Sequence, residues 1–114
     1  MIKLVDYEFE SIPRGSVFRF PGSWPYEKFV DLLVVDMPDK NFAHSLVIST
    51  GHKAGLTLIR LPIEARSEAG TVGISKSWVL HNWKEWIYPD CSINEVHMIR
   101  NYAAPSFTQD NLIK

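Results

Sequence analysis

The chain lacks the features that mark secreted, disulfide-stabilised or membrane-spanning proteins. It has one cysteine, Cys91, so no disulfide can form within the chain. Its longest apolar run, residues 32–35, is far too short to cross a bilayer. Residues 1–10 lack the apolar core and the small-residue cleavage site of a signal peptide. We therefore expect a cytoplasmic protein that does not enter a membrane.

An excess of charge of either sign is also missing. The chain has 12 basic and 13 acidic side chains, which give a formal net charge of −1. Proteins that bind nucleic acid directly need a basic surface to neutralise phosphates, and no basic block occurs here. We expect no direct contact with nucleic acid.

No set of catalytic, metal-binding or cofactor-binding residues can be recognised. The 4 histidines do not have the spacing of a zinc site, and the sequence contains neither Cys-x-x-Cys nor His-Glu-x-x-His. Residues 49–55, STGHKAG, do not match a phosphate-binding loop, which requires Gly-x-x-x-x-Gly-Lys followed by Ser or Thr. The sequence predicts a protein without catalytic residues, metal or cofactor.

What the sequence does contain predicts a small α+β fold. Its 114 residues, 46% of them hydrophobic, are enough for one domain with its own core. Apolar patterns of period two, or apolar on both faces, predict five strands: residues 16–20, 29–35, 45–50, 56–61 and 93–99. Apolarity on both faces of residues 29–35 predicts a central strand. The glycines that bound residues 51–55 predict a hairpin loop.

One helix is predicted in the C-terminal half. Ser75 or Ser77 can cap its start, and Pro89 follows its expected end near Ile87. Strands followed by a single helix predict a mostly antiparallel sheet with the helix packed on one face. We expect this single domain to span residues 1–102 and to be followed by a loosely ordered tail, residues 103–114.

The predicted helix holds 3 of the 4 tryptophans within nine residues. On a helical wheel, Trp83 and Trp86 fall in one apolar stripe, which predicts that both pack against the sheet. Trp78 falls among polar residues, and two interpretations remain open. It folds back to cover the start of the helix, or it is an exposed anchor for a protein partner, because tryptophan is enriched at interface hot spots.

Two loops and several acidic residues offer further contacts. Trp24, framed by prolines, either plugs one end of the core or is presented to a ligand. His52 and Lys53 are expected at the hairpin tip, available to a partner. The alternating acidic residues form a solvated strand face or complement a basic protein: Asp6, Glu8 and Glu10.

A second hypothesis is a small-ligand-binding or enzymatic α+β domain with a pocket between helix and sheet. Its candidate lining residues are His81, Cys91, His97 and Arg100. A ligand that binds only the native state would raise the melting temperature, so a thermal-shift screen with metals and metabolites separates this hypothesis from a protein-binding one.

Three segments together resemble a family of small immunity proteins from bacterial polymorphic toxin and contact-dependent growth inhibition systems. They are residues 21–27, PGSWPYE, residues 49–55, STGHKAG, and residues 74–88, ISKSWVLHNWKEWIY. The resemblance implies a non-enzymatic inhibitor that binds a cognate toxin domain, often a nuclease, in the cytosol. It also implies that the inhibitor blocks the active site of the toxin or the path of its substrate.

The net charge of −1 departs from the strong negative charge of many nuclease inhibitors. Two alternatives remain: a local acidic patch, formed by the acidic residues above or by Glu64 and Glu68, or inhibition through shape. We predict that Trp24, His52, Lys53 and Trp78 contact the partner. Alanine at a hot spot among them should weaken binding by more than about 1 kcal/mol.

Overall fold

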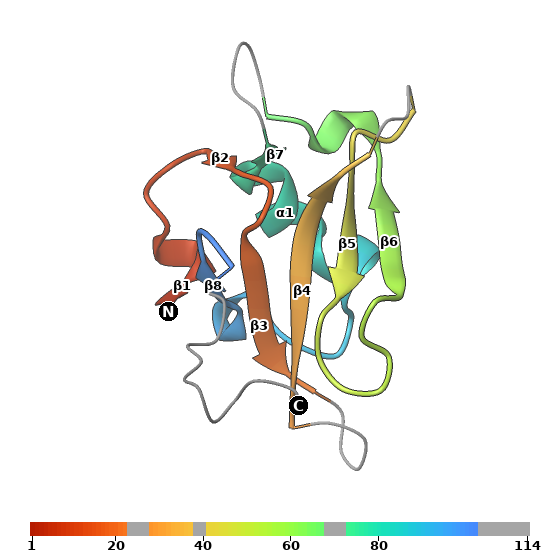
Figure 1. The fold of residues 1–114 in the computed structure, drawn as a ribbon. Coiled ribbons are helices and arrows are strands. Elements are labelled where there is room, and N and C mark those ends of the chain that lie inside the picture. Colours follow the sequence, from red (N-terminus) through yellow and green to blue (C-terminus); the bar gives the residue numbers. More distant parts are fainter. Residues whose placement is uncertain (23–27, 38–40, 68–72, 103–114) are drawn as a thin grey trace, which may run out of the picture.

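A six-stranded antiparallel sheet forms the larger part of the computed structural model, which describes residues 1–22, 28–37, 41–67 and 73–102 (Figure 1). Its strand order is β1-β8-β3-β4-β5-β6. The bounds are β1 Ile2–Lys3, β3 Val17–Pro21, β4 Phe29–Asp36, β5 His44–Ile48, β6 Thr57–Leu61 and β8 His97–Ile99. A separate ribbon pairs β2 (Ser11–Ile12) with β7 (Ile74–Ser75). The predicted mostly antiparallel sheet is confirmed.

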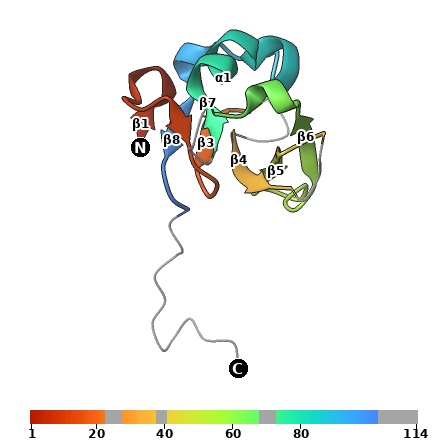
Figure 2. The ribbon, with the colours of Figure 1, turned by 90° about the horizontal axis from the view of Figure 1, so that it is seen from above.

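A single helical segment in the C-terminal half covers one face of the sheet. It consists of α1, Lys76–Asn82, and a π-helical turn, Trp83–Ile87, that continues it. Figure 2 shows this segment lying across the strands on one side, so the predicted α+β fold is confirmed. Short 3₁₀ turns occur at Leu4–Asp6, Ile63–Ala65 and Ile93–Glu95. In the part of the chain that the structure describes, no helix is both long and apolar enough to cross a membrane.

The core lies between the sheet and the helical segment. Strand β4 is central, between β3 and β5, as its two-sided apolarity predicted. Along each strand alternate side chains face the helix, and the fully buried ones from the sheet are Phe18, Phe20, Leu32, Val34, Leu46, Leu61 and Met98. Trp83 inserts from the helix, edge to face with Phe18 and Phe20 at centroid distances of 6.0 and 5.2 Å.

The prediction that Trp86 packs against the sheet is wrong. Trp83 is 1% exposed, as predicted, but Trp86 is 41% exposed. In the π-helical turn the Tyr88 N–H donates to the Trp83 carbonyl, five residues back, at 2.9 Å. This wider turn rotates the chain less per residue than an α-helix. Trp86 therefore lies on the side of Trp78, at a centroid distance of 5.8 Å, and Ile87 takes the buried position.

Two other local predictions were wrong. Residues 93–99 were expected to be one strand, but Ser92 and Glu95 form a capping box that starts a 3₁₀ turn, so the strand is only His97–Ile99. The acidic residues near the N-terminus do not share a strand face, because Leu4–Asp6 is a 3₁₀ turn. The predicted tail, residues 103–114, and Trp24 lie outside the described residues.

Candidate functional site

Cys91 is poorly suited to act as a nucleophile. Its side chain is 5% exposed, and burial raises the pKa of the thiol. Nucleophilic attack needs the thiolate, which this environment disfavours. Among residues 1–22, 28–37, 41–67 and 73–102, no group of three or more His, Cys, Asp or Glu side chains is placed to hold a metal ion.

The four residues proposed to line a helix–sheet pocket do not meet. His81 is exposed on α1, where its Nδ1–H donates to the Ser77 carbonyl at 2.7 Å. His97 pairs in register with Arg19 and therefore lies on the sheet face away from α1. Cys91 is buried, and Arg100 is exposed over the Phe9 ring at 5.5 Å.

A cleft lies at the start of α1 instead. Its volume is about 660 Å³, and its described lining residues are Glu10, Ile63, Glu64, Arg66, Ser67, Ser75 and Ser77. Sequence reasoning named Glu10 and Glu64 only as parts of acidic patches. Three of the lining residues belong to the cap of α1, so this side of the cleft has a structural role.

Glu10 and Ser75 together cap the first turn of α1. The Ser75 hydroxyl accepts from the Trp78 N–H at 3.1 Å, as predicted for an N-cap. The Glu10 carboxylate accepts from the Ser77 N–H at 3.0 Å and from the hydroxyls of Ser75 and Ser77 at 2.7 and 2.9 Å. The Lys76 N–H donates to the Glu10 carbonyl at 2.8 Å. The three N–H groups of residues 76–78 are thereby satisfied.

This cap makes the stability of the fold depend on pH through Glu10. The hydrogen bond from Ser75, and then that from the Ser77 N–H, lower the pKa of Glu10 below its ordinary value of 4.5. A carboxylate with a lowered folded-state pKa stabilises the fold fully above its unfolded-state pKa and loses that contribution as the pH falls through the folded value. The contribution of Glu10 is thus complete above pH 4.5 and declines below it.

We expect Glu10→Gln to lower the free energy of unfolding by about 1 kcal/mol at neutral pH, as for the loss of a helix cap. The difference from the wild-type protein should shrink below pH 4.5, where Glu10 itself becomes protonated. Urea unfolding over a pH series measures this difference in the free energy of unfolding. Glu8→Gln, the same change on an exposed neighbour outside the cap, is the control. A difference that stays constant down to about pH 3 would contradict this role of the carboxylate.

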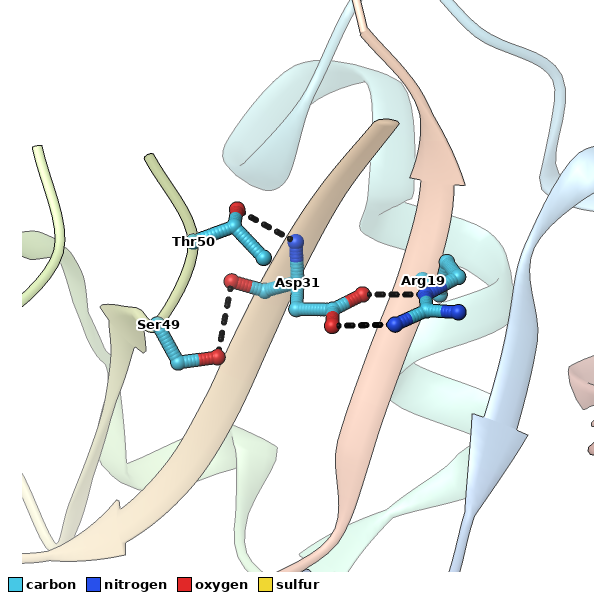
Figure 3. A network of polar contacts seen from close by, with 4 residues as sticks. All are labelled: Arg19, Asp31, Ser49 and Thr50. Atoms are coloured by element: carbon cyan, nitrogen blue, oxygen red, sulfur yellow. Dashed lines mark hydrogen bonds and ion pairs between the residues drawn. The ribbon is translucent and has the colours of Figure 1, made fainter. Parts of the chain in front are cut away.

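A polar network crosses the sheet face opposite α1 (Figure 3). Arg19 on β3 and Asp31 on β4 form a bidentate ion pair, with Nε–Oδ1 and Nη2–Oδ2 distances of 2.7 and 2.8 Å. The guanidinium also lies 4.2 Å from the centroid of the Phe29 ring. The Asp31 N–H donates to the Thr50 hydroxyl at 3.1 Å, and the Asp31 carbonyl accepts from the Ser49 hydroxyl at 3.3 Å. These contacts join β3, β4 and the segment after β5 on a face that the helix does not cover.

The predicted contact residues that the structure describes, His52, Lys53 and Trp78, do not form one site. His52 and Lys53 are exposed in the loop between β5 and β6, and this hairpin is as predicted. In Figure 1 the loop of this hairpin lies at the lower ends of the strands, whereas the first turn of α1 lies near β7, toward their upper ends. Trp78, half-buried in that turn, is therefore not next to His52 and Lys53. Contact of these residues with a partner stays a prediction.

Trp78 and Trp86 form an aromatic pair on the outer side of the helical segment. Their rings are tilted by 59° at a centroid distance of 5.8 Å. Trp78 also packs against the core and Trp86 is more exposed, while His81, Lys84 and Glu85 are exposed on the same segment. Sequence reasoning missed the surface position of Trp86 because a helical wheel assumes one uniform period, and no residue of the segment signals the wider turn.

Comparison with known proteins identifies the family. A family model described as Immunity protein 45 matches residues 4–98, well over half of the chain. A search of curated proteins and a search of solved structures each found no match. The matched region runs from the first 3₁₀ turn to β8, so it contains the central strands of the sheet, the helical segment and the aromatic pair. The resemblance to immunity proteins is confirmed: the chain belongs to the Immunity protein 45 family.

Proposed function

We propose that this protein neutralises a cognate bacterial toxin by binding its toxic domain in the cytoplasm. Binding blocks the active site of the toxin or the access of its substrate. The observation that carries the proposal is the family match over residues 4–98. The protein acts as a stoichiometric inhibitor and not as an enzyme. Its partner is the toxin domain encoded immediately upstream.

Exposed apolar side chains in the described surface support a protein partner. They include Leu56, which is 58% exposed, and Trp86, which is 41% exposed. Interface cores are enriched in aromatic residues and poor in charged ones. We propose that Trp24, His52, Lys53 and Trp78 contact the toxin, and that each alanine variant at a hot spot weakens binding by more than about 1 kcal/mol. Unchanged affinity in all four variants would show that these residues lie outside the interface.

Co-expression tests the function. Cells that produce the toxin domain alone should stop growing, and cells that also produce this protein should grow. The two proteins should co-purify as a stoichiometric complex. If this protein neither rescues growth nor binds the neighbouring toxin domain, the proposal is contradicted.

Titration separates inhibition from catalysis. If the protein is an inhibitor, the remaining toxin activity falls linearly with added protein and reaches its minimum at a fixed molar ratio. Loss of all toxin activity at a small fraction of that ratio would identify an enzyme that modifies the toxin.

A further inference from the structure

The switch from α-helix to π-helical turn at Trp83 moves a tryptophan from the core to the surface. Continued α-helical geometry would place Trp86 beside Trp83 in the apolar stripe. The wider turn leaves Trp86 41% exposed and brings it against Trp78. π-helical turns are rare and occur frequently at functional sites. Trp86 therefore leaves apolar surface in contact with water, and a partner that covered this surface would gain the free energy of its burial.

Trp78 provides a rigid base for the pair. Its N–H donates to the Ser75 hydroxyl at 3.1 Å, and its carbonyl accepts from the Asn82 side chain at 2.8 Å. Its ring packs partly against the core. Because Trp78 is held in place, little of its side-chain entropy is lost when a partner binds.

The helical segment that carries the pair exposes one residue of each charge, Lys84 and Glu85, together with His81. These residues give the segment no net charge to attract a strongly basic or acidic surface. A rigid aromatic centre with a mixed polar rim is the arrangement of an interface hot spot.

We propose that Trp78 and Trp86 form the anchor on which the toxin domain docks, and that the toxin contributes an apolar side chain to the contact. This inference rests on the proposed function. It adds Trp86 and the outer side of the helical segment to the interface, and it assigns inhibition to shape and apolar contact.

The test measures the affinity of the full-length protein for the toxin domain encoded upstream. Trp86→Ala should raise the dissociation constant by at least about tenfold, and Trp86→Phe should retain most of the affinity. Phe29→Ala is the matched control: Phe29 is aromatic and 40% exposed, against 41% for Trp86, but lies on β4. It should bind like the wild-type protein. Circular dichroism of each variant checks that it is folded.

Salt dependence tests the chemistry of the partner. Raising the ionic strength from about 0.1 to about 0.5 M screens exposed charges, so an apolar contact should change the wild-type dissociation constant by less than about threefold. A steep loss of affinity would overturn the apolar anchor.

The results distinguish failure of the tryptophan anchor from failure of the proposed function. If the wild-type protein binds the toxin and folded Trp86→Ala binds equally well, the anchor is overturned and the proposed function stands. Equal losses in Trp86→Ala and Phe29→Ala would also overturn it, because the loss would not be specific to the pair. If the wild-type protein does not bind at all, the proposed function is overturned, and the anchor with it.

Discussion

Replacing Trp83 with alanine should lower the free energy of unfolding by about 3–5 kcal/mol, the range for large aromatic side chains removed from a core. Trp83 is 1% exposed and has the largest volume among the fully buried side chains. Its ring makes edge-to-face contacts with Phe18 and Phe20 on β3. The substitution removes these contacts and leaves a cavity between helix and sheet that the surrounding strands can fill only in part. Urea unfolding followed by circular dichroism measures the loss without depending on tryptophan fluorescence.

Trp86→Ala is the matched control for this prediction. It makes the same chemical change three residues later in the same helical segment, but at an exposed position. We expect it to cost about 1 kcal/mol or less, because substitutions at the surface seldom cost more. Equal losses of stability in the two variants would contradict the division of the tryptophans into one core residue and one surface residue.

Gly73→Ala should also destabilise the protein strongly, by about 3 kcal/mol, the upper end of the cost of backbone strain at a single residue. Gly73 has a φ of +137°, which residues with a Cβ rarely adopt. An added Cβ would lie 2.3 Å from the Ile12 carbonyl oxygen and 3.0 Å from the Ser11 hydroxyl oxygen. Both neighbours belong to β2, so the clash would push β2 away from β7. Urea unfolding again measures the effect.

A second glycine separates the two causes of this loss. Gly55 has a φ of +94°, but no atom lies within 4 Å of an added Cβ. Gly55→Ala therefore bears only the cost of the left-handed backbone, about 1 kcal/mol. If Gly73→Ala is no more destabilising than Gly55→Ala, the close approach of β2 to Gly73 does not constrain the fold.

The ribbon of β2 and β7 matters beyond its own stability. Ser75 in β7 is the N-cap of α1, and Glu10 just before β2 completes the cap. Disturbing this ribbon should therefore weaken the start of the helix that carries Trp78. Gly73→Ala is expected to lower toxin affinity through this loss of folded structure, whereas Trp86→Ala should lower it in a protein that remains folded.

Local patterns were enough to predict most of the fold. The central position of β4, the hairpin between β5 and β6, and the N-cap at Ser75 each follow from residues adjacent in sequence. The cap contributed by Glu10 does not, because 65 residues separate Glu10 from Ser75. The last strand is shorter than the expected residues 93–99 because Ser92 and Glu95 form a capping box that starts a 3₁₀ turn. Both residues are visible in the sequence, but the apolar alternation of residues 93–99 favoured a strand.

By itself, the sequence determined the longer strands and the single helical segment, because apolar periodicity, turn residues and caps act over a few positions along the chain. The family followed from the resemblance of three short segments to immunity proteins. Only the tertiary structure decided the roles of the clustered tryptophans. Trp83 and Trp86 occupy one stripe on a uniform helix, but packing of Trp83 and Ile87 against the sheet is accompanied by a wider turn that rotates Trp86 out to Trp78. Which aromatic ring is core and which is surface thus depends on contacts with strands remote in the sequence, which no local pattern contains.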